Sequence, residues 1–94
     1  MRTIERSSAF KRDYKRVQAN SHHRKNLDLL ISDVLSYLSK DNVLPEKNRD
    51  HPLGGNWEGY RECHIKPDLL LIYEKPNRHT LQLVRLGSHS ELFG

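Results

Sequence analysis

The sequence has a single cysteine, Cys63. One cysteine excludes an internal disulfide and the usual zinc sites built from paired thiolates, and it fits a reducing cytosol. No apolar run approaches the roughly 18 residues of a membrane span, and the start "MRTIERSSAF" lacks the apolar stretch of a secretory signal. The histidines show no helical ligand pair such as His-x3-His, so we expect no metal ion and no cofactor. These absences favour a cytoplasmic protein without a membrane partner.

Internal repeats and low-complexity segments are also absent. A chain of 94 residues buries only roughly 60 to 65% of its unfolded surface, which leaves no room for two cores. We therefore expect one domain over residues 1–94, built from two layers of secondary structure.

The charge is positive and unevenly distributed. The net charge is +4, and residues 1–50 hold eleven Lys and Arg against seven Asp and Glu, whereas residues 51–94 hold five of each. A basic domain suggests a polyanionic partner, such as nucleic acid or an acidic protein. Ordinary solubilising charge is the alternative, and composition alone does not decide between them.

The N-terminal half predicts a short strand and two helices. The strand covers "RTIERS" (residues 2–7), and Ser7 or Ser8 then offers a helix N-cap. From Phe10 the apolar residues recur at helical spacing, and a basic outer face lies opposite them, formed by Lys11, Arg12, Lys15 and Arg16. A second, stronger amphipathic helix follows from Leu27 to Leu38, in which only Leu29 points the wrong way.

The C-terminal half predicts a long loop and three strands. Periodicity is lost over residues 40–59, and a loop of this length is commonly functional. Strand-like composition then covers residues 60–65, 69–74 and 79–86, separated by the proline-containing turns "KPD" and "KPNRH". The expected fold is α+β in the order β-α-α-β-β-β, with a mostly antiparallel sheet and both helices packed on it.

Five polar residues at strand ends and in the long loop are not explained by packing. They are His51, His64, Asp68, Arg85 and His89. Arg85 has the inward parity of Leu81 and Leu83, and a guanidinium on that face needs a carboxylate or an anion. Cleavage of RNA through its own 2′-hydroxyl requires a base, an acid and a cation at the phosphate, and these side chains could supply all three.

Each candidate also has a purely structural interpretation. His64 shares its strand face with Glu62, and that face could equally be solvated. A tight turn favours an aspartate such as Asp68 without any function. We interpret His22 and His23 as polar residues at a helix start and His79 as a turn residue. Trp57 is interpreted as a core residue or a hairpin anchor and not as a platform on which a base stacks.

Two segments carry a resemblance to a known family. They are "DHPLGGNWEGYRECHIKPDLLLIYEK" and "LVRLGSHSELFG", with the combination "DHPL", "W-x-G-x-R-x-x-H-I-x-P-D" and "R-x-G-(S/T)-H-(S/A)-x-LF". Together they resemble a YafQ-type toxin of the RelE/ParE superfamily closely over residues 48–94, whereas the N-terminal half matches in pattern only. The resemblance implies the toxin of a bacterial type II toxin–antitoxin system: a ribosome-dependent mRNA endoribonuclease that cuts mRNA in the ribosomal A site.

The resemblance also implies site residues and partners. Its catalytic set falls on His51, His64, Asp68, Arg85 and His89, and Phe93 supports or stacks on a base. Which histidine is the base and which the acid stays open. The implied partners are a DinJ/RelB-like antitoxin, the 70S ribosome with its mRNA and, through the antitoxin, operator DNA.

A basic surface would then face ribosomal RNA phosphates, and binding should depend steeply on salt. It comprises Lys11, Arg12, Lys15, Arg16, Arg24 and Lys25. Two alternatives remain: a ParE-like toxin that binds a topoisomerase without cutting RNA, and a basic RNA-binding module without activity.

Overall fold

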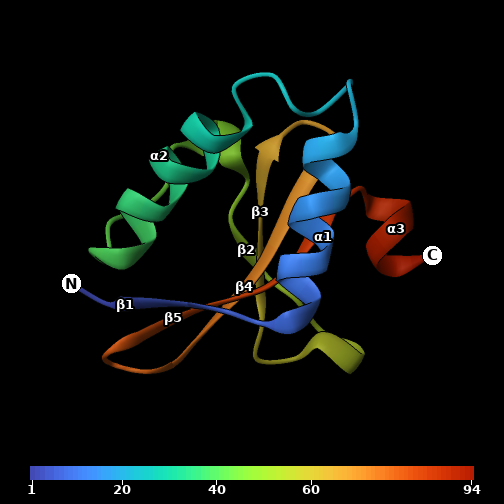
Figure 1. Ribbon diagram of the computed structural model, residues 1–94. Coiled ribbons are helices and arrows are strands. Elements are labelled where there is room, and N and C mark those ends of the chain that lie inside the picture. Colours follow the sequence, from blue (N-terminus) through green and yellow to red (C-terminus); the bar gives the residue numbers. More distant parts are fainter.

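The computed structural model describes residues 1–94 and shows helices packed against one sheet (Figure 1). A strand, β1 (Thr3–Arg6), leads into two helices, α1 (Ser8–Ala19) and α2 (Leu27–Ser39). Four strands follow: β2 (His51–Pro52), β3 (Arg61–Lys66), β4 (Leu69–Asn77) and β5 (Thr80–Gly87). Two 3-10 turns, η1 (Glu46–Asn48) and η2 (Gly55–Trp57), flank β2, and a short helix, α3 (His89–Phe93), ends the chain. The predicted α+β order is confirmed.

The five strands form one sheet in the order β1-β5-β4-β3-β2. β1 pairs with β5 in parallel, and all other pairs are antiparallel. The long crossover through both helices makes the parallel pair possible. The predicted strands are confirmed, although β4 continues through Pro76, which lies at its exposed end instead of in a turn.

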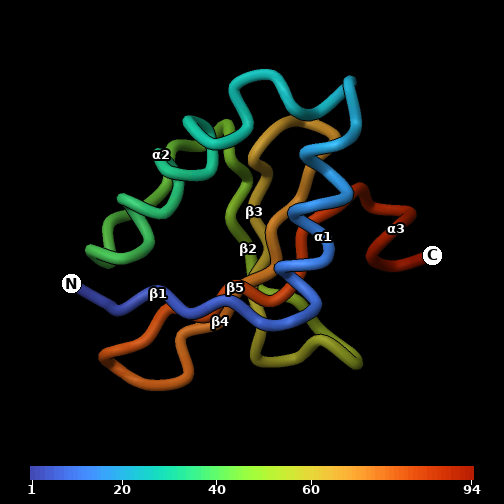
Figure 2. Tube along the Cα trace, in the orientation of Figure 1, coloured from blue at the N-terminus to red at the C-terminus, as the bar shows by residue number.

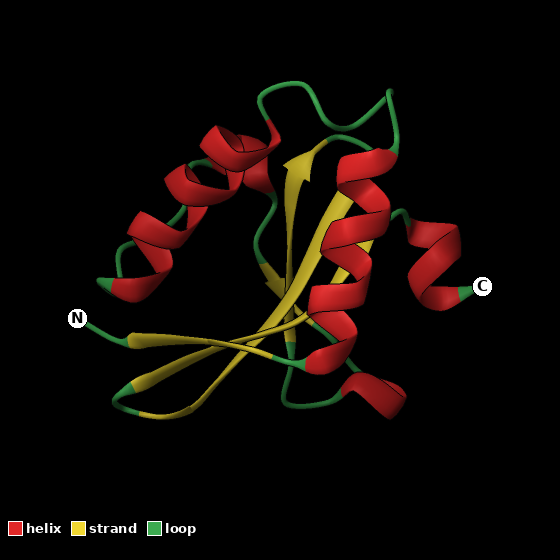
Figure 3. Cartoon of the chain, in the orientation of Figure 1, coloured by secondary structure: helices red, strands yellow, loops and turns green.

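Local sequence explains both long helices. The Ser7 hydroxyl caps α1 by accepting a hydrogen bond from the Phe10 N–H at 3.0 Å, as predicted. The apolar stripes of α1 and α2 pack on the same sheet face, and Leu29 is 73% exposed, as its position in the pattern predicted. Figure 3 shows both helices, in red, against the yellow strands. No helix has both the length and the apolar character needed to cross a bilayer.

The central strand β4 is buried on both faces, which explains its uninterrupted apolar run. Leu69, Leu71 and Tyr73 join the core under the helices. Leu70 and Ile72 face the opposite side, where they pack with Leu92 of α3 in a second, smaller cluster. In Figure 2 the C-terminal helix α3, in red, lies on the other side of α1 from α2.

The chain end is more ordered than a tail. Ser88 and Glu91 form a capping box, in which Glu91 Oε1 accepts from the Ser88 N–H at 2.8 Å and Ser88 Oγ accepts from the Glu91 N–H at 3.2 Å. Together with the burial of Leu92, this fixes α3 on the sheet face away from α1 and α2.

Candidate functional site on the open sheet face

Four residues form one register row across the sheet, on the face opposite α1 and α2. His51 pairs with Glu62, Glu62 with Ile72, and Ile72 with Arg85. Three strand spacings separate the ends of this row, which is roughly 14 Å. His51 and Arg85 thus lie on one surface of the sheet, although their backbones are too far apart for both to contact the same phosphate-sized group.

Two histidines share one carboxylate in this row. His51 Nε2 lies 3.5 Å and His64 Nε2 lies 3.8 Å from Glu62 Oε1. The Nδ1 atom of His51 is 2.7 Å from the Arg49 carbonyl, and that of His64 is 3.2 Å from the Pro67 carbonyl. A carbonyl only accepts hydrogen bonds, so each neutral imidazole carries its proton on Nδ1 and keeps a lone pair on Nε2.

The face that His64 shares with Glu62 is therefore only partly solvated. Glu62 is 5% exposed, whereas His51 is exposed and His64 is half-buried. The buried carboxylate thus lies beside the Nε2 atoms of two imidazoles, a side chain that can both accept and donate a proton.

A partly buried hydrogen-bond network fixes Asp50, the residue before His51, to β3 and β4. The Tyr73 hydroxyl donates to Asp50 Oδ1 at 2.6 Å, and Arg61 Nη2 donates to Asp50 Oδ2 at 3.2 Å. Burial and the Asp50 hydrogen bond both raise the pKa of Tyr73, which therefore stays a neutral donor. Asn48, 7% exposed, donates its side-chain amide to the His64 carbonyl at 2.8 Å. The end of the long loop, just before β2, is thus attached to β3 and β4.

Arg85 finds the carboxylate that the sequence predicted it would need. Its Nε and Nη2 donate to Asp13 at 2.6 and 3.2 Å, and Asp13 Oδ2 also accepts from the Leu86 N–H at 3.0 Å. Burial opposes ionisation of Asp13, but the hydrogen bonds from Arg85, Leu86 and Arg16 outweigh it and lower the pKa of this carboxyl. The hydrogen bond from Asp13 likewise raises the pKa of Arg85.

The predicted inward parity of Arg85 is wrong. The register shifts between Ile72 and Tyr73, which pair with Arg85 and Leu83, so β5 gains one residue there. Leu86 joins Leu83 under the helices, and Arg85 pairs with Ile72 on the opposite face. This β-bulge reverses the inward–outward alternation of side chains along β5, and the local sequence gives no signal that predicts it.

Arg16, predicted on the basic outer face, is exposed, and its guanidinium also binds groups of the chain itself. It donates to Asp13 at 2.8 Å and to the Leu86 carbonyl at 3.0 Å, and it pairs with Glu91 of α3 at 3.1 Å. A side chain at Gly87 would lie 3.0 Å from the Arg16 guanidinium and 3.1 Å from Glu91. The glycine therefore allows α3 to approach the end of β5.

Aromatic rings surround the C-terminal helix. The Phe93 ring lies 6.0 Å from Trp57 and 5.0 Å from His89, centroid to centroid, and Trp57 lies 5.5 Å from Tyr60. The His89 side chain is exposed and makes no hydrogen bond within the chain. Trp57 anchors this minor cluster and not the main core.

Asp68 does not join the histidine row. It accepts from His22 at 2.7 Å, and this hydrogen bond lowers the pKa of Asp68 below its ordinary value. His22 and His23 were predicted at a helix start, but α2 begins only at Leu27, and both lie in the turn after α1. His23 is 7% exposed.

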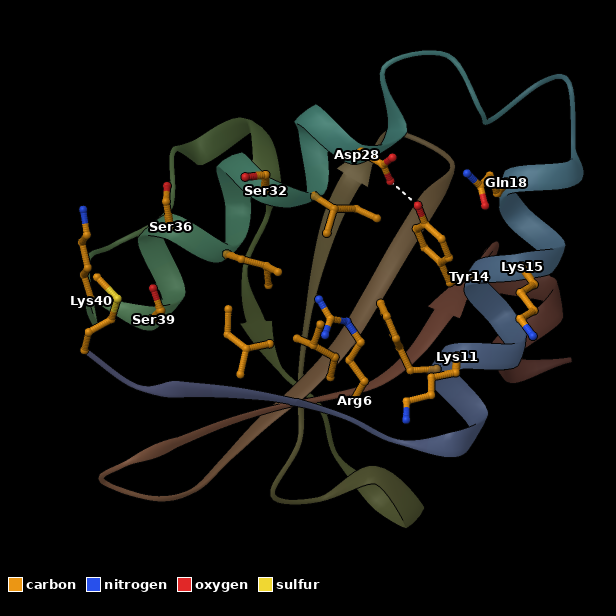
Figure 4. A pocket seen from close by; sticks show the side chains of 16 residues that line it. Arg6, Lys11, Tyr14, Lys15, Gln18, Asp28, Ser32, Ser36, Ser39 and Lys40 are labelled. Carbon is orange, nitrogen blue, oxygen red and sulfur yellow. Dashed lines mark hydrogen bonds between the residues drawn. The ribbon is translucent and has the colours of Figure 1, made fainter.

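The other side of the sheet carries a hollow. A groove of about 970 Å³ separates α1 from α2, floored by Ile4 and Leu83 and spanned at one end by the hydrogen bond from Tyr14 to Asp28 (Figure 4). Lys11 and Lys15 line its α1 side. All six residues of the predicted basic surface are exposed.

Comparison with known proteins identifies the family. Residues 2–94 match the family described as "Bacterial toxin of type II toxin-antitoxin system, YafQ". The chain belongs to the YafQ family.

Curated and solved relatives agree with this family. The mRNA interferase toxin YafQ of Escherichia coli K12 is 36% identical over 93 residues, which cover 99% of this chain and 97% of that protein. The chain is thus a homologue of an mRNA interferase, an endoribonuclease. A metal-bound toxin from Helicobacter pylori superposes with a TM-score of 0.84 at 48% identity, covering 99% of this chain and 100% of that one.

The E. coli DinJ–YafQ complex also contains a similar chain. It superposes with a TM-score of 0.81 at 35% identity, and the match covers both chains completely. The predicted YafQ-type resemblance and fold are confirmed.

Two residues of the site escaped the sequence prediction. Asp13 follows Phe10 by three residues and therefore lies on the apolar face of α1, where a carboxylate needs a cationic partner. Glu62 alternates with the apolar residues of β3 and gave no comparable signal. Glu62 belongs to the site because the long loop brings His51 beside it, and this contact cannot be predicted from the sequence of β3 alone.

Proposed function

We propose that residues 1–94 form one toxin domain that cleaves mRNA in the ribosomal A site through the RNA 2′-hydroxyl, without a metal ion. The proposal rests on one observation above all: His51 and His64 present the lone pairs of their Nε2 atoms beside Glu62, on the face that also carries Arg85 and α3. Membership of a family that includes an mRNA interferase supports it.

Proton transfer is assigned to the three histidines. A neutral imidazole with its proton on Nδ1 can take the 2′-hydroxyl proton on Nε2, and a protonated imidazole can supply the 5′-oxygen. His51 and His64 fit the first step, because a backbone carbonyl fixes the Nδ1–H of each and Glu62 stabilises the resulting cation. His89, which is exposed and free of internal hydrogen bonds, fits the second. This narrows the roles that the sequence left open.

Arg85 is the proposed cation at the scissile phosphate. Asp13 fixes its guanidinium, which remains 29% exposed and can still offer donors to an anion. Phe93, half-buried against Trp57 and His89, is proposed to support a base. Asp68 lies in the turn that also supplies the Pro67 carbonyl to His64, and we propose an orienting role for it.

Binding to the ribosome is proposed to use the exposed cations of α1 and of the turn that follows it. They are Lys11, Arg12, Lys15, Arg24 and Lys25, whereas the guanidinium of Arg16, also exposed, is engaged by Asp13 and Glu91. Phosphate contacts of this kind weaken steeply as salt rises. Such a toxin acts in the cytoplasm, where its antitoxin neutralises it. The groove between α1 and α2, apolar at its floor and basic at its rim, fits an acidic amphipathic segment of an antitoxin.

The decisive experiment is brief induction followed by primer extension on a translated mRNA. The wild type should arrest growth and produce new 5′ ends inside coding regions. H64Q and H89Q should each lower cleavage by roughly 10²- to 10⁴-fold, because each removes one proton-transfer group. H79Q is the matched control, since His79 is an exposed histidine in the β4–β5 turn. Full cleavage by both H64Q and H89Q would contradict the mechanism.

The same experiment separates the two alternatives. A ParE-like toxin would induce the DNA-damage response and leave mRNA uncut. An inactive RNA-binding module would shift RNA in gels while its expression stayed harmless.

A further inference from the structure

The turn between α1 and α2 and the turn between β3 and β4 bring together three metal-ligating side chains. One ligand atom from each of His22, His23 and Asp68 lies within 4.8 Å of the others. The sequence predicted no metal site, because it has no paired cysteines and no His-x3-His spacing. We propose that His22, His23 and Asp68 bind a divalent transition-metal ion, and that this ion is Zn²⁺.

A buried imidazole supports this proposal independently of the clustering. His23 is 7% exposed, and its Nδ1 atom is buried without a hydrogen-bond partner. Buried polar atoms are nearly always paired, so this nitrogen calls for an explanation. Coordination of a metal ion through Nδ1 would give it the partner that the protein does not supply.

The surrounding backbone holds the ligands in place. Lys66, two residues before Asp68, donates its ammonium to the carbonyls of His23 and Lys25 at 2.6 and 3.1 Å, which pins the histidine turn to the end of β3. Asn20 closes that turn by accepting from the backbone N–H groups of His22 and His23 at 2.9 and 3.0 Å. The ligands are therefore presented by two turns that are already joined.

The donor set and its geometry fit Zn²⁺. Two imidazole nitrogens and one carboxylate oxygen are usual zinc ligands, and bond lengths near 2.0 to 2.2 Å place tetrahedral ligand atoms roughly 3.3 Å apart. His22 Nε2 and Asp68 Oδ2, now 2.7 Å apart, need to separate only slightly. Their side chains are 70% and 55% exposed, which leaves solvent access for a fourth ligand.

Zinc titration of the untagged, chelator-treated protein tests the site by calorimetry. We expect saturable 1:1 binding, an affinity at least tenfold weaker in H22Q and H23Q, and unchanged affinity in H79Q. Because His22 is largely exposed, H22Q should fold even if H23Q does not. A Tm rise of several degrees in excess Zn²⁺ should appear in the wild type and disappear in H22Q.

Two results would overturn the proposal. One is the absence of saturable binding in the folded wild type. The other is Zn²⁺ binding that survives in H22Q. If zinc binding were lost in H51Q instead, the ion would lie beside Glu62. These readouts measure binding and stability, so they stand whether or not the chain cleaves RNA.

Discussion

The ion pair between Asp13 and Arg85 should be the most sensitive point of the site. In D13N the amide offers one oxygen and one NH2 group in place of two oxygens. Oδ1 accepts from Arg16 and Arg85, and Oδ2 accepts from Arg85 and the Leu86 N–H. In either orientation of the D13N amide, its NH2 group replaces an oxygen that accepted two hydrogen bonds, so two donors of the chain lose their acceptor.

The expected loss follows from these contacts. Breaking a buried ion pair costs about 3 to 5 kcal/mol, and a buried N–H without an acceptor costs about 1 to 3 kcal/mol. The Arg85 and Arg16 side chains are 29% and 44% exposed, so water can compensate part of both losses. We therefore expect D13N to lower the free energy of unfolding by about 2 to 4 kcal/mol.

Urea unfolding at pH 7 measures this loss, with D33N as the matched control. Asp33 lies on the exposed face of α2, and its side chain makes no hydrogen bond, so D33N should change stability by less than about 0.5 kcal/mol. A D13N loss no larger than that of D33N would refute the reasoning.

The same pair predicts a pH dependence. The pKa of Asp13 is lowered from its ordinary value of 3.8, so its contribution is complete above that value and is lost as pH falls through the lower pKa of the folded state. The stability difference between wild type and D13N should therefore be constant from pH 7 to about pH 5 and shrink in stronger acid. If the stability difference between wild type and D13N grew on acidification, the lowered pKa of Asp13 would be contradicted.

Three further changes test how the site is held. G87A should destabilise by about 1 to 2 kcal/mol, because its methyl group meets Arg16 and Glu91, whereas G54A, with nothing within 4 Å, should be neutral in the same urea assay. Y73F should cost about 1 to 2 kcal/mol by removing the donor to Asp50, and Y60F, which loses no internal hydrogen bond, is its control. E62Q should leave folding nearly intact but slow cleavage about tenfold or more at pH 7, because the positive charge that develops on His51 or His64 during proton transfer loses its carboxylate partner, and an unchanged rate would exclude that role.

Much of the fold followed from local chemistry. The helical spacing of Phe10, Tyr14 and Val17 with the Ser7 cap predicted α1, and the apolar run on β4 predicted a central strand. Short-range signals failed where the chain is irregular: β2 has only two residues and depends on pairing with β3, and the short helix α3 was not predicted.

The sequence by itself determined which residues are available to the site: the histidines, Arg85 and the turn aspartate, at spacings typical of one family. Only the tertiary structure decided their partners. A bulge turned Arg85 to the open face, where Asp13, 72 residues away, fixes it. The long loop brought His51 to the carboxylate that also faces His64, and two turns joined Asp68 to His22. Periodicity and capping act over a few residues, whereas these pairings depend on register and packing between segments that are distant in the sequence.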